Sequence, residues 1–129
     1  MAGRIASASV VALLSRTDAI ALLDAVSDPR FAEAAGLLRA ALEAGAKFGF
    51  SGREVPTREL RDIWLMRREL CRDLGVEVLG LEGLADAVAA SEYDTLRIAT
   101  VAGTHSGGIF LDPLGRFVGC VVSGSTEPE

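Results

Sequence analysis

Residues 94–122, with the sequence DTLRIATVAGTHSGGIFLDPLGRFVGCVV, decide the fold class of this 129-residue chain. Apolar residues recur at every second position of residues 96–102, which predicts a strand. The glycine-rich residues 103–108 predict a turn, and residues 109–111 resume the strand pattern. Asp112, Pro113 and Gly115 suit the first, second and fourth positions of a tight turn. The stretch therefore predicts a three-stranded antiparallel meander that ends in a hairpin.

Helical spacing dominates the residues before this stretch. It covers residues 10–26, as one bent helix or two short ones, and residues 29–44, 57–74 and 82–91. Asp28 and Pro29 are typical of a helix start, and Gly45 and Gly75 are typical of helix ends. The second helix carries its apolar stripe at Phe31, Ala35, Leu38 and Leu42.

Two short segments between the helices complete the expected order of elements. Residues 47–53 (KFGFSGR) predict a glycine-punctuated loop or a short extended piece, and residues 76–81 (VEVLGL) predict a short strand. The expected fold class is α+β, with a helical N-terminal two-thirds packed on a small, mostly antiparallel C-terminal sheet. The runner-up is an α/β layer in which Val76 to Leu81 joins the same sheet in parallel.

Composition indicates one soluble globular domain over residues 1–122, followed by a flexible tail over residues 123–129. Apolar residues 5–14 are too few to span a bilayer, so we expect no membrane association and a cytoplasmic protein. Cys71 and Cys120 have no metal-binding spacing and suit free thiols in a reducing compartment. The preference for Arg over Lys suggests a GC-rich bacterial genome.

Charge argues against nucleic acid as the partner. The net charge is −5, from 13 basic and 18 acidic side chains, and the acidic excess lies in residues 73–129. A nucleic-acid binder needs a basic face, and only the short arginine-rich segment 53–72 offers one. An acidic surface is instead typical of proteins that meet a basic protein partner.

The glycine-rich loop holds the candidate catalytic residues. His105 is the sole histidine, beside Thr104 and Ser106, and Asp112 follows one strand later. An imidazole oriented by a carboxylate can act as a general base toward a hydroxyl or a water. A surface histidine without a catalytic role is the simpler interpretation, and the sequence predicts neither a metal site nor a cofactor.

Arg61, Arg68 and Arg72 form a row along the predicted helix 57–74. Guanidinium groups bind phosphates and carboxylates with two parallel hydrogen bonds, so the row is a candidate anion-binding site. The alternative is a solvated helix face whose arginines pair with neighbouring acids, and the usual amphipathicity of helices favours it.

The last predicted strand is apolar on both faces, with candidate partner-binding residues Phe117, Val118, Cys120 and Val122. A strand with one solvated face should alternate, and this one does not. Either the chain's own helices cover both faces, or a partner covers one of them. We therefore expect binding to another protein or, without one, a homodimer.

Two functional hypotheses follow. The first is a non-catalytic protein-binding module, such as an adaptor, an antitoxin or an immunity-type inhibitor, that acts through the acidic C-terminal half and the last strand. The alternative is a small enzyme or ligand-binding domain that uses the His105 loop. Because no other titratable side chain accompanies the histidine in that loop, the sequence favours the non-enzymatic hypothesis.

Overall fold

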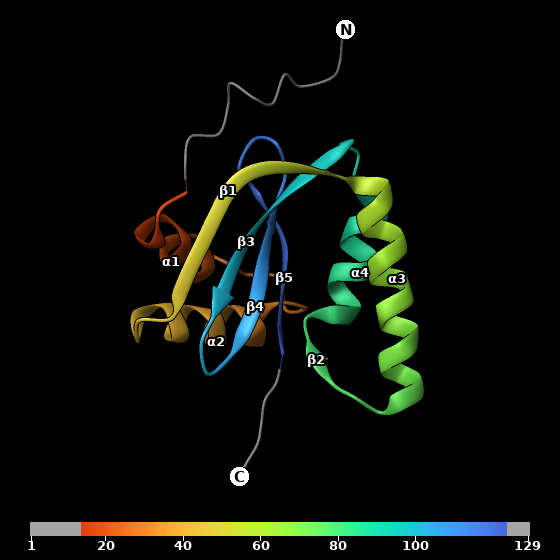
Figure 1. The fold of residues 1–129 in the computed structure, drawn as a ribbon, viewed down its shortest axis with the longest axis horizontal. Coiled ribbons are helices and arrows are strands. Elements are labelled where there is room, and N and C mark those ends of the chain that lie inside the picture. The colour runs from red at the N-terminus through yellow and green to blue at the C-terminus, as the bar shows by residue number, and fades with distance from the viewer. Residues whose placement is uncertain (1–13, 124–129) are drawn as a thin grey trace, which may run out of the picture.

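The computed structural model describes residues 14–123, which form four helices and one five-stranded sheet (Figure 1). The elements follow the order α1 (Arg16–Asp24), α2 (Ala32–Glu43), β1 (Lys47–Pro56), α3 (Thr57–Leu74), β2 (Val78–Leu79), α4 (Leu81–Ala90), β3 (Thr95–Ala102), β4 (Ser106–Leu111) and β5 (Phe117–Ser123). The mixed α+β class is therefore as the sequence predicts, with most of the sheet after the helices.

The strands lie in the order β1-β3-β4-β5-β2, and every neighbouring pair is antiparallel. The predicted meander forms its centre. The turn between β4 and β5 closes with a hydrogen bond from the Gly115 amide to the Asp112 carbonyl, 2.9 Å long. The Asp112 carboxylate also accepts hydrogen bonds from the amides of Leu114 and Arg116, so the aspartate holds the turn with its side chain as well as its backbone.

Two parts of the sheet differ from the sequence prediction. Residues 47–53, expected as a loop or a short extended piece, form most of β1, a 10-residue edge strand paired with β3. Its register shifts between Phe50 and Glu54, where Gly52 takes a positive φ of 76°, and this irregularity hides the strand in the local sequence. The runner-up topology is wrong, because β2 pairs with β5 in the antiparallel direction.

Some of the helix ends follow the local sequence signals. Ser15 caps α1, and its hydroxyl accepts a hydrogen bond from the Asp18 amide. The predicted helical residues 10–13 lie outside the described residues. The predicted helix start at Asp28 and Pro29 is three residues too early, because Asp28 opens a turn and α2 begins at Ala32 without a side-chain cap. Gly75 ends α3 in the left-handed conformation, as predicted.

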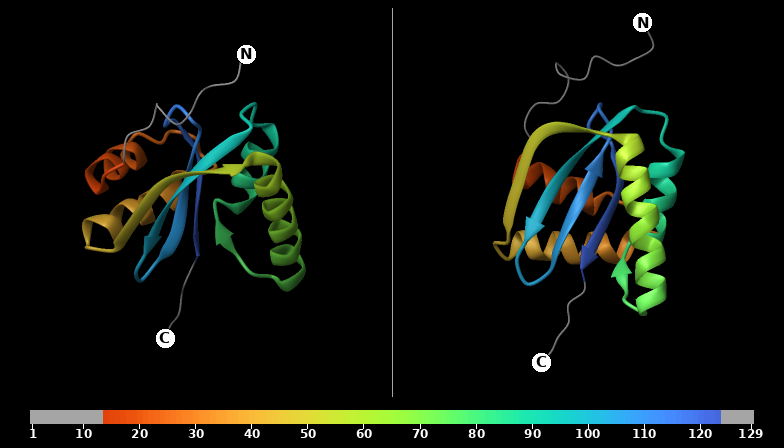
Figure 2. Two further views of the ribbon diagram at one scale, coloured as in Figure 1. Left: turned by 45° about the horizontal axis from the view of Figure 1, so that its top comes forward. Right: turned by 45° about the vertical axis from the view of Figure 1, so that its right-hand side comes forward.

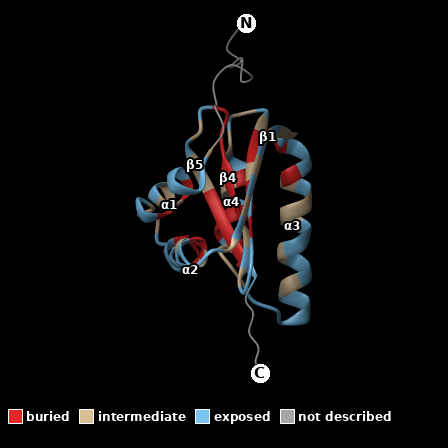
Figure 3. Ribbon diagram, turned by 60° about the vertical axis from the view of Figure 1, so that its left-hand side comes forward, coloured by how far each residue is buried: buried red, intermediate tan, exposed pale blue. Residues whose placement is uncertain are grey.

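Helices cover both faces of the sheet. Figure 2 shows α1 and α2 on one side and α3 and α4 on the other, and Figure 3 shows α1 and α2 across the sheet from α3. We call the first side the α2 face and the second the α3 face. The α2 face buries side chains from the three central strands, namely Ala99, Val101, Ile109, Cys120 and Val122. Within residues 14–123, no helix is long and apolar enough to cross a membrane.

Candidate functional site

A groove runs along the α3 face between α3 and the sheet, and we call it the α3 groove. It has a volume of about 410 Å³ and is open on one side. Its floor comes from β2, β3, β4 and β5, and its wall from α3 and the start of α4. The lining residues are Trp64, Arg67, Leu70, Cys71, Val78, Leu81, Ile98, Thr100, Ser106, Gly107, Gly108, Phe110, Val121 and Ser123.

Two aromatic rings in edge-to-face contact lie between α3 and the sheet. The indole of Trp64 meets the Phe110 ring edge-on, with 5.5 Å between the ring centroids. The Arg67 guanidinium lies over the outer side of Trp64, 4.7 Å from the centroid. Because the contact with the sheet is made by an indole rather than a small side chain, the following turns of α3 cannot approach the strands closely.

The open side of the groove continues onto an exposed apolar stripe of α3. Met66, Leu70 and Leu74 are 64%, 54% and 66% exposed, and their spacing of four places them on one side of the helix. Val76, just after the helix, is also exposed. Large apolar side chains in a row are unusual on a monomer surface, because each leaves apolar area in contact with water.

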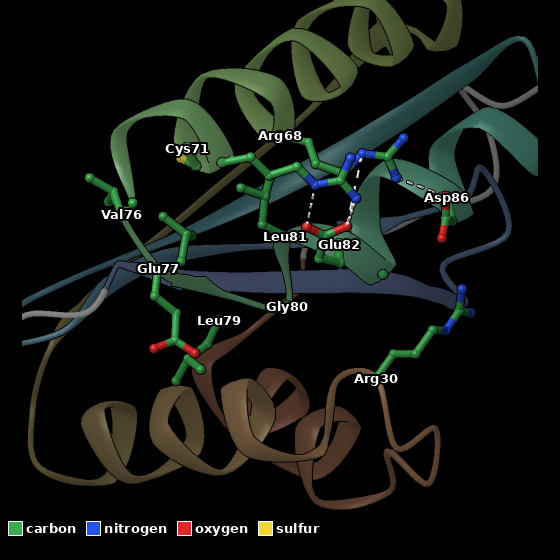
Figure 4. Close-up of a pocket in the computed structure, with 14 residues that line it drawn as sticks. Arg30, Arg68, Cys71, Val76, Glu77, Leu79, Gly80, Leu81, Glu82 and Asp86 are labelled. Atoms are coloured by element: carbon green, nitrogen blue, oxygen red, sulfur yellow. Dashed lines mark hydrogen bonds and ion pairs between the residues drawn. The ribbon is translucent and has the colours of Figure 1, made fainter.

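On its opposite side, α3 forms ion pairs with α4. These residues line a second pocket, which has a volume of about 530 Å³ (Figure 4). Arg68 donates to Asp86 at 2.9 Å, and Arg72 donates to Glu82 at 2.7 Å. The carboxylate of Glu82 raises the pKa of Arg72 above its ordinary value.

These ion pairs bear on whether the arginine row is an anion-binding site or a solvated helix face. Two of its members, Arg68 and Arg72, form ion pairs with acidic residues of α4. These pairs stabilise the contact between α3 and α4 and occupy the guanidinium groups that an external anion would need. Arg61 does not line this pocket. The solvated-face interpretation of the row therefore fits the geometry better than the anion site.

The structure separates the candidate catalytic residues. Thr104 and His105 line a third pocket of about 470 Å³, against the C-terminal end of α2. Ser106 lines the α3 groove instead. Asp112 lies beyond the far end of β4, where its carboxylate binds the Arg116 guanidinium at 2.9 Å. Among the described residues, the Nδ1 atom of His105 has no hydrogen-bond partner. No carboxylate from the candidate set therefore orients the imidazole.

The chain's own helices account for the apolar last strand. Cys120 and Val122 are fully buried, and Phe117 and Val118 are partly buried. Phe117 meets the Phe31 ring edge-on at 5.6 Å. Burial raises the pKa of the Cys120 thiol to about 12. Cys120 and Val122 thus have no accessible surface for a partner in this conformation.

Sequence reasoning missed two features of the described residues. Arg97, expected as one position of an alternating strand, is buried and donates to the Gly52 and Pro113 carbonyls and to Glu54. It ties β1 to the β4–β5 turn. The α3 groove was also missed, although a signal existed: the apolar residues of α3 extend around more of the helix than one buried face needs.

Comparisons with known proteins identify no relative: no protein-family model, curated protein or solved structure matches this chain. Within residues 14–123, no group of three His, Cys, Asp or Glu side chains is arranged to hold a metal ion.

Proposed function

We propose that this protein is a binding module that takes up a segment of another protein in the α3 groove. The observation that carries the proposal is the continuity of the groove with the exposed stripe of Met66, Leu70 and Leu74. A concave apolar floor beside a convex apolar ridge is the surface that a protein interface buries at its centre.

The proposal keeps the first hypothesis from the sequence and moves the binding surface from β5 to α3. Val121 and Ser123 are the residues of β5 that line the groove, and Val121 is the apolar one at its floor. The other apolar residues of that strand serve the core. The enzymatic alternative loses support because His105, Ser106 and Asp112 do not share a site.

The test compares two exposed leucines. Leu70 lines the groove, whereas Leu114 is exposed in the β4–β5 turn outside it. The wild-type protein, Leu70→Asp and Leu114→Asp are immobilised in turn and offered an extract of the source organism. A protein retained by the wild type is identified, produced separately and titrated against all three forms by calorimetry. We expect Leu114→Asp to bind like the wild type and Leu70→Asp to bind at least about tenfold more weakly, as for a residue at the centre of an interface.

Circular dichroism first establishes that both variants fold, as expected for substitutions of exposed side chains. Equal affinity of Leu70→Asp and the wild type for the purified partner would show that the groove is not the binding surface. Loss of binding in Leu114→Asp alone would place the surface at the turn.

A further inference from the structure

The charges beside the exposed stripe of α3 point to the chemistry of the segment that the α3 groove receives. We propose that this segment is an amphipathic helix with basic side chains along one edge of its apolar stripe. This inference rests on the proposed binding function and specifies the partner's docking segment. The observations behind it are an acidic edge of the exposed stripe, a single charged residue in the groove lining and the length of the stripe.

One edge of the exposed stripe is acidic. Glu59 and Asp62 precede Met66 by seven and four positions, and Glu69 and Asp73 follow it by three and seven. Residues at these spacings lie on the same side of a helix, so all four carboxylates lie beside the stripe. All four side chains are exposed, and none of them lines the groove. We call these four residues the acidic edge.

The carboxylates of the acidic edge have little engagement within the chain. Glu59, Asp62 and Asp73 form no ion pair with any other described residue. Glu69 lies 4.0 Å from Arg72, whose guanidinium is already bound to α4. A basic side chain of a partner can therefore pair with these carboxylates without first breaking a strong ion pair of this chain.

Basic side chains near the stripe are fewer. Arg67 is the one charged residue among the described residues that line the groove, and its guanidinium lies 4.7 Å from the Trp64 centroid. Arg58 is exposed one turn before Asp62 and forms no ion pair with it. Lys47, on the edge strand β1, does not line the groove. The acids thus outnumber the bases along the stripe, and a partner's basic side chains gain attraction and selectivity at the acidic edge.

The position of Arg67 restricts where the partner's positive charge can lie. A basic side chain that entered the groove beside this guanidinium would be repelled. The complementary helix therefore carries its basic residues on one edge only, over the acidic edge. Its other edge, which enters the groove, is uncharged.

The shape favours a helix over a smaller ligand. Met66 and Leu74 are eight positions apart, which is about 12 Å along the helix axis. A small amphiphile inside the groove would leave most of this stripe in water. A helix laid beside α3 covers the stripe and places some of its own side chains in the groove, since rows of side chains spaced by four interdigitate between packed helices.

The experiment uses a pair of synthetic helical peptides and the chain's single tryptophan. Each peptide has about 18 residues, or five helical turns, with leucines along one side and Gln along one edge of the leucine stripe. The basic peptide has Lys along the other edge, and its acidic twin has Glu at the same positions. Neither peptide contains an aromatic residue, so Trp64 in the groove wall reports binding through its fluorescence. We expect the basic peptide to bind at least about tenfold more tightly at low salt, and added salt to narrow the difference.

A charge reversal at the acidic edge sharpens the test. In the double variant Glu59→Lys with Glu69→Lys, we expect the preference for the basic peptide to disappear. The matched control is Glu33→Lys with Glu43→Lys, which changes the net charge equally at exposed positions of α2, across the sheet. Each pair includes one acid from the first turn of its helix and one acid beside an arginine. Circular dichroism establishes that both variants fold, and the control should keep the preference.

Other outcomes contradict specific parts of the proposal. Equal binding of both peptides, abolished by Leu70→Asp, would keep the binding function and overturn the basic partner. Loss of the preference in both double variants would assign it to net charge and overturn the role of the acidic edge. If neither peptide bound while the partner from the extract still required Leu70, the binding function would stand and the basic helix would be wrong. If that partner also bound Leu70→Asp equally, both would be overturned.

Two further measurements identify a different occupant. If dodecylamine alone changed the Trp64 fluorescence and saturated, a small amphiphile would replace the helix. If the wild type sedimented as a dimer that Leu70→Asp dissociated, the occupant would be a second copy of this chain.

Discussion

The two faces of the sheet are covered by helices of different character. On the α2 face, the helices present small side chains, including Ala19, Ala34 and Ala35, and all three are buried. On the α3 face, α3 meets the sheet through the Trp64 indole and leaves a groove of about 410 Å³. The helices of the two faces thus differ in how far their side chains are buried against the sheet, and not simply in side-chain size, since α2 also buries Leu38 and Leu42.

The two faces also differ in whether the leucines of their helices are buried or exposed. Leu38 and Leu42 of α2 are buried and belong to the core. Leu70 and Leu74 of α3 are chemically the same and point to water. Burial, and not residue type, is therefore what distinguishes a stabilising leucine from one that is available to a partner.

The largest expected effect comes from matched leucine truncations on the two faces. Leu38→Ala should lower the free energy of unfolding by about 2–5 kcal/mol, because it removes fully buried methyl groups and leaves a cavity. Leu70→Ala should change it by no more than about 0.5 kcal/mol, because the side chain is exposed. Urea denaturation measures both. Similar losses would mean that the α3 groove is closed in solution.

The next effect concerns the point where α4 meets β5. A Cβ atom at Gly80 would lie 2.1 Å from the Cys120 carbonyl oxygen, and the φ angle there is 83°. Gly75, at the end of α3, has a similar φ of 70° and open space around it. Gly80→Ala should therefore cost about 1–3 kcal/mol more than Gly75→Ala in thermal or urea unfolding. Equal costs would show that α4 does not approach β5 this closely.

The reactivity of the two cysteine thiols provides a chemical comparison of the two faces of the sheet. Cys120 is buried on the α2 face, whereas Cys71 lines the α3 groove. Burial raises the pKa of Cys120 from 9.0 to about 12, so the folded state keeps this thiol protonated at a pH where the unfolded chain ionises it. A thiol reagent at about pH 8 should modify Cys71 in the native protein and both cysteines in denaturant.

The same shift predicts a dependence of stability on pH. The contribution of Cys120 is complete below pH 9.0 and declines as the pH rises toward about 12. The decline amounts to at most about 1.4 kcal/mol per pH unit. The variant Cys120→Ala should lack this part of the slope. An unchanged slope in that variant would mean that the thiol is accessible to water.

The smallest effect is expected at the α3–α4 ion pairs. Asp86→Asn removes the nearer acidic partner of Arg68, which also lies 4.0 Å from Glu82. The loss of unfolding free energy should not exceed about 1 kcal/mol because the Asp86 side chain is largely exposed. Asp62→Asn, the same change at a residue of α3, serves as the control. A larger loss for Asp86→Asn, measured by urea denaturation, would show that the pair sets the position of α3 and with it the width of the groove.

Local patterns in the sequence were sufficient for several elements. The alternation before and after the glycine-rich turn predicted β3 and β4, although β4 begins at Ser106, within the residues expected as the turn, and the DPLG turn predicted the β4–β5 hairpin. The stripe of α2 and the end of α3 at Gly75 were likewise correct. These features depend on residues within a few positions of one another, so a short window contains the physical cause.

The other features depend on contacts between segments that are far apart in the sequence, so only the tertiary structure determined them. Residues 47–53 became a strand through pairing with β3, about 50 positions later in the sequence, and a short window contains no trace of that partner. The same limit hid the role of Arg97, whose hydrogen bonds reach Gly52 and Pro113. The groove depends on how far Trp64 holds α3 from Phe110, a distance set by packing between elements. Periodicity showed which residues are apolar, and only packing decided which of them remain in water.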